Sequence, residues 1–329
     1  MIDLTTKTAR RSALAAGAGL MVTGLAGPSA HAADPTGAHT PGQWSGLGVM
    51  KGTSRGYVTT PMGQVHYISQ SPADGGGRPL VLLHQSPWFS IQFAKVLPLL
   101  AARGFAAVAP DRPGFGMSDV PDTPPTVEDY ADNLADTLDA LGIEQAAVVG
   151  HHTGSGVAVA LAHRHPGKVS RLVLDGVPFY TAEQRAQRLA RPHWDRWLEP
   201  DGAHLKARFD ARANSKGRQL RAAGVDTGQD RAWLAGVQWS VMSLFLAGET
   251  EWYGHNAAFS YDMTDALGAI AAPTLIVSYT EDALYEMNKR AHAARPDFEM
   301  ITFEGGHAQM PFDEPEHWVD AVAPFLEAG

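Results

Sequence analysis

The sequence predicts an α/β protein with a mostly parallel sheet and helices on both faces, and two observations carry this prediction. The first is an alternation of short apolar, β-branched runs with helical stretches along residues 79–175 and again from residue 273. The second is the segment 146–162, where an apolar run stops at Gly150, Gly154 follows, and an Ala- and Val-rich pattern with helical spacing begins. That order predicts a strand, a tight turn and a helix.

The expected elements follow one another along the chain. Residues 57–69 predict an antiparallel hairpin, because two alternating runs are joined by a Pro-Met-Gly turn. Residues 126–141 predict a helix with Leu134, Leu138 and Leu141 on one face and acidic residues at its start. Six further strands are expected at residues 79–84, 105–110, 146–150, 171–175, 273–279 and 299–303.

Composition excludes several classes of function. The chain of 329 residues has 35 acidic and 26 basic side chains, a net charge of -9, and no run of Lys and Arg. Binding to nucleic acid or to an anionic membrane is therefore not expected. Cysteine is absent, so neither a disulfide nor a thiol nucleophile is available.

The N-terminus has the features of a secretory signal peptide. Lys7, Arg10 and Arg11 precede an uncharged run at residues 13–25, and Ala30-His31-Ala32 provides a small-x-small cleavage site. The adjacent arginines resemble a twin-arginine signal, which predicts export. A membrane anchor is the alternative, but an uncharged run of thirteen residues is shorter than the about 20 that span a bilayer. We expect a signal peptide at 1–32 and a flexible leader at 33–55.

The spacing Gly150-x-x-x-Gly154 matches the nucleophile elbow Gly-x-Ser-x-Gly, with His152 at the serine position. Through this motif the chain resembles the α/β-hydrolase fold family, and four more segments fall in the family's order. They are the oxyanion loop at residues 79–87, the Gly-rich loop at 109–119, the acid strand at 273–282 and the histidine loop at 303–307. The resemblance implies an eight-stranded core at 56–176 and 266–329, with a helical cap at 177–265 inserted after the sixth strand.

The resemblance also implies a site and an activity. In the family a serine is deprotonated by a histidine that a carboxylate orients, and two backbone N–H groups hold the oxyanion. His307 and Asp282 match the base and the acid, and the oxyanion donors correspond to Ser86 and Thr153. An exported enzyme that hydrolyses an ester, lactone or amide of a small, partly apolar molecule is expected, without metal or cofactor. The expected substrate-binding side chains are His84, Gln85, Trp88, Trp239 and Trp252.

Four roles are open for His152. It could attack a carbonyl covalently, because neutral imidazole carries a lone pair at pH 7. It could act as a general base in hydrolysis, elimination or isomerisation. With His307 and Asp282 it could bind a metal ion. Finally, the chain could be a binding protein that kept the pocket and lost the chemistry.

Neighbouring residues have their own alternatives. His151 and Ser155 are expected to pack, Ser86 could replace the missing serine, and Asp175 is the second candidate for the acid. The loop that contains Ser86 also resembles that of dehalogenases and epoxide hydrolases. Those enzymes need an aspartate at the elbow, which His152 does not provide.

Overall fold

The computed structural model describes residues 52–190, 199–222 and 232–328. The signal peptide predicted at residues 1–32 and nearly all of the leader predicted at 33–55 lie outside the described residues. Within the described residues, no helix combines the length and the apolar character needed to cross a membrane.

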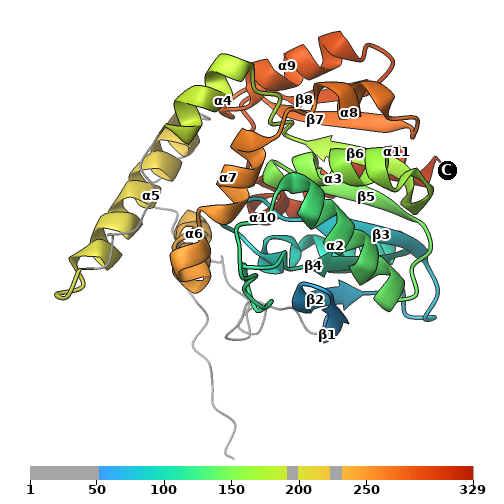
Figure 1. Ribbon diagram of the computed structural model, residues 1–329, viewed down its shortest axis with the longest axis horizontal. Coiled ribbons are helices and arrows are strands. Elements are labelled where there is room, and N and C mark those ends of the chain that lie inside the picture. The colour runs from blue at the N-terminus through green and yellow to red at the C-terminus, as the bar shows by residue number, and fades with distance from the viewer. Residues whose placement is uncertain (1–51, 191–198, 223–231, 329) are drawn as a thin grey trace, which may run out of the picture. The chain divides into compact units, whose positions relative to one another are not determined.

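In the described part of the chain, eight strands form one sheet in the order β1-β2-β4-β3-β5-β6-β7-β8 (Figure 1). The β1/β2 and β2/β4 pairs are antiparallel and all other pairs are parallel, so the sheet is mostly parallel and begins with the hairpin, as predicted. The carboxyl ends of the parallel strands therefore meet at one edge of the sheet. The strands are β1 (Ser54–Thr60), β2 (Gly63–Gln70), β3 (Arg78–Leu83), β4 (Phe105–Pro110), β5 (Ala146–His151), β6 (Val169–Asp175), β7 (Thr274–Tyr279) and β8 (Glu299–Phe303).

Each face of the sheet carries its own core. In β3, Leu80 and Leu82 join the cluster on one face, and Val81 and Leu83 join the cluster on the other, since side chains alternate along a strand. Both faces are therefore covered by helices. α1 (Val96–Ala102) and α11 (Pro315–Glu327) cover the first, and α2 (Val127–Ala140), α3 (Thr153–Arg164), α8 (Thr264–Ala269) and α9 (Tyr285–Ala294) cover the second. Of three further short helical turns, η1 (Ser90–Phe93) and α10 (Met310–Asp313) contribute buried side chains, whereas η2 (Pro166–Lys168) has none.

The predicted helix at residues 126–141 is α2. Its start is fixed by Thr126, whose side chain accepts a hydrogen bond from the backbone N–H of Asp129, while the Asp129 side chain accepts one from the backbone of Thr126. Leu134 and Leu138 are buried in the core, as their spacing predicted.

In the described residues between β6 and α8, the chain forms α4 (Ala182–Leu189), α5 (Ala203–Ala222), α6 (Ala232–Ala247), η3 (Gly248–Thr250) and α7 (Tyr253–Ser260). These helices lie together beyond one end of the sheet (Figure 1). Thr250 Oγ1 donates to the carbonyl of Gly114, 2.8 Å away, and Gly254 packs so closely on Ser86 that an added Cβ would lie 2.0 Å from its Oγ. Because Gly114 and Ser86 follow β4 and β3, this segment covers the carboxyl ends of the strands.

Candidate active site

The turn between β5 and α3 holds one residue, His152, with φ 49° and ψ -110°. It is the only non-glycine residue with positive φ in the described part of the chain, a conformation that costs about 1–3 kcal/mol. Both flanking glycines are required. A Cβ at Gly150 would lie 2.4 Å from the carbonyl oxygen of Gly154, and a Cβ at Gly154 would lie 2.2 Å from that of Leu83. The close packing of strand, helix and loop thus forces the strain onto His152.

The imidazole of His152 binds directly to Asp282, which follows β7. Its Nε2 lies 2.9 Å from Oδ2 of Asp282, whose side chain is 4% exposed. The ring lies over Gly176, just after β6, where a Cβ would come within 2.4 Å of Cδ2 of His152. Nδ1 of His152 makes no hydrogen bond within the described residues.

The contact with Asp282 sets the chemistry of the ring. Burial lowers the pKa of His152, but the charge of Asp282 and its hydrogen bond outweigh burial, so the pKa is raised above its ordinary value of 6.5. The carboxylate accepts the hydrogen on Nε2 and so leaves the lone pair of neutral His152 on Nδ1. This arrangement can accept a proton, or attack a carbonyl, at Nδ1.

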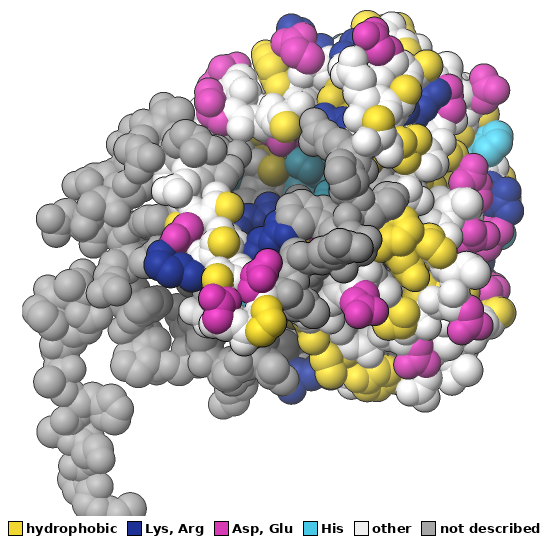
Figure 2. Space-filling model, turned by 60° about the vertical axis from the view of Figure 1, so that its left-hand side comes forward, with side chains coloured by type: hydrophobic (Ala, Val, Ile, Leu, Met, Phe, Trp, Pro, Cys, Tyr) yellow, Lys and Arg dark blue, Asp and Glu magenta, His cyan; other side chains and the backbone are white. Residues whose placement is uncertain are grey.

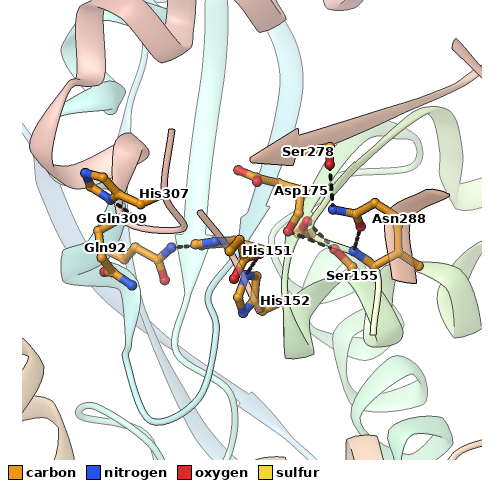
Figure 3. A network of polar contacts seen from close by, with 12 residues as sticks. Gln92, His151, His152, Ser155, Asp175, Ser278, Asn288, His307 and Gln309 are labelled. Atoms are coloured by element: carbon orange, nitrogen blue, oxygen red, sulfur yellow. Dashed lines mark hydrogen bonds and ion pairs between the residues drawn. The ribbon is translucent and has the colours of Figure 1, made fainter. Parts of the chain in front are cut away.

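His307 is placed differently from the sequence prediction. It is almost fully buried, its Nδ1 accepts a hydrogen bond from the backbone N–H of Gln309, and its Nε2 lies 3.9 Å from carboxylate oxygens of Asp313 and Glu314. Figure 3 shows it beside Gln309, on the side of His151 opposite to Asp175. The predicted relay, with His307 between the elbow residue and Asp282, is therefore not the arrangement observed.

The metal site considered for His152, His307 and Asp282 is not formed either. Across residues 52–190, 199–222 and 232–328, no three His, Cys, Asp or Glu side chains are grouped so that they could bind one metal ion.

The predicted oxyanion donors are backbone N–H groups of Ser86 and Thr153. Neither donates a hydrogen bond to another residue in the described part of the chain, so both are available to a ligand. The loop before Ser86 is held by Gln92, whose Oε1 accepts from the N–H of Gln85 at 3.1 Å and whose Nε2 contacts Nδ1 of His151. Gln92 thus ties the oxyanion loop to the strand that carries the elbow.

His151 is the fully buried partner in this contact. Burial lowers its pKa well below the ordinary value, and the charge of His152 lowers it further. His151 is therefore a neutral packing residue, in agreement with the sequence prediction.

His84 was predicted to bind substrate, and the structure corrects this. The side chain is fully buried, its Nε2 accepts from the N–H of Arg112 at 3.0 Å, and its Nδ1 donates to the carbonyl of Gln85 at 2.8 Å. Burial lowers the pKa of His84 well below its ordinary value, and the charge of Arg112 adds to this. Both ring nitrogens are thus used to connect the two loops.

The other predicted contact residues divide into two groups. Trp88 is 2% exposed and packs on Phe312 with ring centroids 5.2 Å apart, so its predicted role in binding is replaced by one in the core. Trp239 and the half-buried Trp252 lie in the segment between β6 and β7 and stay candidates. Gln85 keeps one buried amide nitrogen, Nε2, without a hydrogen-bond partner in the described part of the chain.

Asp175 and Ser155 form hydrogen bonds with the backbone of the turn that holds His152. The backbone carbonyl of Asp175 accepts from the N–H of His152 at 2.8 Å, and its Oδ2 accepts from the indole of Trp318 at 2.9 Å. Burial raises the pKa of this carboxyl to about 7. Ser155 is fully buried and donates to the carbonyl of Gly150 at 2.6 Å, as expected for a packing residue. Ser155 therefore does not replace the missing serine, and the carboxylate that binds the imidazole of His152 is that of Asp282 rather than that of Asp175.

Sequence reasoning missed Gln92, Gly176 and Arg112. Asn288 holds the segment of Gly176 in place, because its Oδ1 accepts from the N–H of Val177 at 2.6 Å (Figure 3). Arg112 donates to Oγ of Ser86 at 2.8 Å. Its place as the single basic residue of the Gly-rich loop at 109–119 was the one signal in the sequence that could have identified Arg112.

Comparisons with curated proteins give hydrolases and a haloperoxidase. A 2-hydroxymuconate semialdehyde hydrolase of Pseudomonas sp. (strain CF600) is 43% identical over 108 residues, which are 31% of this chain and 37% of that protein. A non-heme chloroperoxidase of Streptomyces lividans is 29% identical over 247 residues, 69% of this chain and 82% of that protein. The match to the first of these relatives spans only about a third of its length.

Solved structures agree in fold. The enol-lactonase from Burkholderia xenovorans LB400 has a TM-score of 0.67 at 20% identity and covers 83% of this chain and 100% of its own. E-2-(acetamidomethylene)succinate hydrolase has a TM-score of 0.64 at 21% identity, covering 84% and 100%. Residues 78–314 match the family described as alpha/beta hydrolase fold, and the chain therefore belongs to the α/β-hydrolase fold family.

Proposed function

We propose that this protein hydrolyses an ester, lactone or amide bond of a small, partly apolar molecule, with His152 as general base and Asp282 as the group that orients it. The observation that carries this proposal is the 2.9 Å contact between Nε2 of His152 and Asp282, made at the strained elbow position. The family and the named hydrolases among its relatives support a hydrolytic reaction.

The proposed step needs only groups at this site. Nδ1 of neutral His152 takes a proton from water as the water oxygen attacks the carbonyl carbon, and Asp282 stabilises the imidazolium that forms. The N–H groups of Ser86 and Thr153 bind the oxygen that becomes negative. When the intermediate collapses, His152 returns the proton to the leaving group.

Hydrolysis in H₂¹⁸O tests this mechanism. A 4-nitrophenyl ester should release an acid that contains one ¹⁸O atom, and intact protein quenched during turnover should keep its unmodified mass. A mass increase located on His152 would show covalent attack by imidazole instead. On the natural substrate, a product without ¹⁸O would support a lyase or isomerase that uses the same base, and the absence of any turnover would support a binding protein.

We also propose export by the twin-arginine route, on the basis of Arg10 and Arg11 before the uncharged run. Replacing both arginines by lysine should leave uncleaved precursor inside the cell, as measured by fractionation. Unchanged export of the double variant would contradict this route.

A further inference from the structure

Four arginines away from the elbow form ion pairs with carboxylates in the described part of the chain. The pairs are Arg103 with Asp320, Arg164 with Asp132, Arg185 with Asp262 and Arg295 with Asp297. Arg112, Arg188 and Arg212 form no ion pair within the described residues, and neither do Arg55, Arg78, Arg171 and Arg290. Arg78, Arg171 and Arg290 donate to backbone carbonyls instead. Since the chain has more acidic than basic side chains, unpaired arginines call for a physical explanation.

Arg112 is the most unusual of these unpaired arginines because it is only 4% exposed. One of its nitrogens donates to Oγ of Ser86, but Nε and Nη1 have no hydrogen-bond partner in the described part of the chain. Burial lowers its pKa to about 10, so it stays charged at neutral pH. A buried cation without a counter-ion is unfavourable by several kcal/mol, a cost that a bound anion would remove.

Arg188 lies on the segment between β6 and β7, in α4. Its guanidinium carbon is 4.6 Å from the ring centroid of Tyr180 and 5.2 Å from that of Phe259. Phe259 in turn stacks on His255 of α7, with centroids 5.7 Å apart. Aromatic rings thus hold this arginine without neutralising it.

The three arginines act on the same imidazole. Burial lowers the pKa of His255 to about 4, and the charges of Arg212, Arg112 and Arg188 contribute in the same direction. The residue before His255 is Gly254, which packs against Ser86 of the oxyanion loop. Arg112, through Ser86, and Arg188, through Phe259, therefore both lie beside the Gly254–His255 segment that packs on the oxyanion loop, and the charge of Arg212 reaches the same imidazole.

Carboxylates near these arginines do not balance the charge. Asp282 is already bound to His152, and Glu251 is shared by two arginines of α5, Arg208 and Arg212. Figure 2 shows a hollow in the surface in which basic side chains and a histidine are visible. The space over the elbow is therefore positive although the whole chain is negative.

We propose that the substrate carries a carboxylate besides the bond that is hydrolysed, and that this carboxylate binds among Arg112, Arg188 and Arg212. Guanidinium groups bind a planar carboxylate through paired hydrogen bonds, and they do so most strongly where water is excluded. This inference rests on the proposed hydrolysis and specifies its substrate class.

A pair of esters of similar size and different charge tests the inference. We expect kcat/KM of the wild type to be about 10–100-fold higher for mono-4-nitrophenyl succinate than for 4-nitrophenyl butyrate, as one or two charge-assisted hydrogen bonds provide. In Arg188→Gln and in Arg212→Gln this ratio should fall about tenfold, and it should fall with rising salt. The control is Arg164→Gln, which removes a surface arginine paired with Asp132 and should keep the wild-type ratio.

Binding separates this inference from the proposed function. If neither ester is hydrolysed, the hydrolase proposal fails, and calorimetry with succinate then tests the anion site by itself. Saturable binding that is weakened in the Arg188→Gln/Arg212→Gln double variant supports the site. A wild-type ratio near one, a ratio unchanged in both single variants, absence of succinate binding, or tighter binding of inorganic phosphate than of succinate would each overturn the proposal.

Discussion

His152 is partly buried and His307 is buried, and the family pattern assigns both to one catalytic relay, yet their surroundings differ. His152 bonds to Asp282, whereas His307 contacts Gln309, Asp313 and Glu314. The physical reason is reach. A serine side chain ends one atom beyond Cβ and needs a second side chain to connect it to the carboxylate, but an imidazole at the same position spans that distance itself. One substitution thus removes the nucleophile and bypasses the base.

The largest difference in activity is expected between the alanine variants of the two histidines. His152→Ala should lower kcat/KM by about 10²–10⁴-fold, the contribution of one positioned acid-base group, whereas His307→Ala should lower it less than tenfold. Steady-state kinetics with a 4-nitrophenyl ester measures both, and circular dichroism checks that each variant is folded.

Equal losses in the two variants would break the comparison. His307 would then take part in the reaction in a conformation different from the one described here, and the relay predicted from the sequence would be restored.

Asp282→Asn should have the next largest effect, a loss of about 10²-fold or more, because the asparagine neither fixes the tautomer nor stabilises the imidazolium. It should also move the pH profile. The base must be neutral, so kcat/KM of the wild type should rise with pH through a pKa above 6.5. Without the charge of Asp282 the pKa of His152 falls, so the rise of kcat/KM should begin at lower pH in the variant. A rise of kcat/KM at the same pH in both proteins would show that a group other than His152 controls the pH dependence.

Gly176→Ala tests the position of the His152 ring separately from its chemistry. The added Cβ would collide with the ring at 2.4 Å and push it from Asp282, so we expect kcat/KM to fall about tenfold. Gly142→Ala is the matched control, because Gly142 has nearly the same φ, 72° against 74°, and no atom within 4 Å of the added Cβ. Both variants should lose about 1–2 kcal/mol of stability from the left-handed backbone. Equal activity in the two would contradict the proposed role of the contact.

The fold could be predicted from the sequence because it depends on local patterns. The glycines at positions 150 and 154 predict the turn, since their neighbours leave no room for a Cβ. The alternation of apolar residues in strands such as β3 predicts burial on both faces. Both patterns depend on contacts between residues that are close together in the sequence, so they can be recognised from the sequence alone.

The site was predicted only in part, because its pairings are long-range. The sequence placed His152, Asp282 and His307 at the ends of three strands, but it did not determine which imidazole the carboxylate binds. His84 looked like a ligand-binding residue because nothing in the sequence shows that Arg112 and Gln85 use both ring nitrogens. The unpaired arginines were also not apparent, since the absence of a counter-ion is a property of the packed molecule.

The smallest expected effect concerns Asp175, whose carboxyl titrates near His152 and Asp282 without a side-chain hydrogen bond to either of them in the described part of the chain. Its folded-state pKa of about 7 exceeds the ordinary 3.8, so between these values the folded protein holds a proton that the unfolded chain has lost. Stability should therefore fall as pH rises from about 4 through 7. Asp175→Asn removes the ionisation that destabilises the fold at high pH, and it keeps an acceptor for Trp318. The Tm of this variant should therefore exceed that of the wild type by on the order of 5 °C at pH 8 and by less at pH 5. Asp132→Asn is the control of opposite sign, because Arg164 lowers the pKa of Asp132 and its charge stabilises the fold at pH 8. A Tm difference for Asp175→Asn that does not grow between pH 5 and pH 8 would mean that this carboxyl is ionised throughout, and that the negative charge beneath His152 comes from two carboxylates rather than from Asp282 alone.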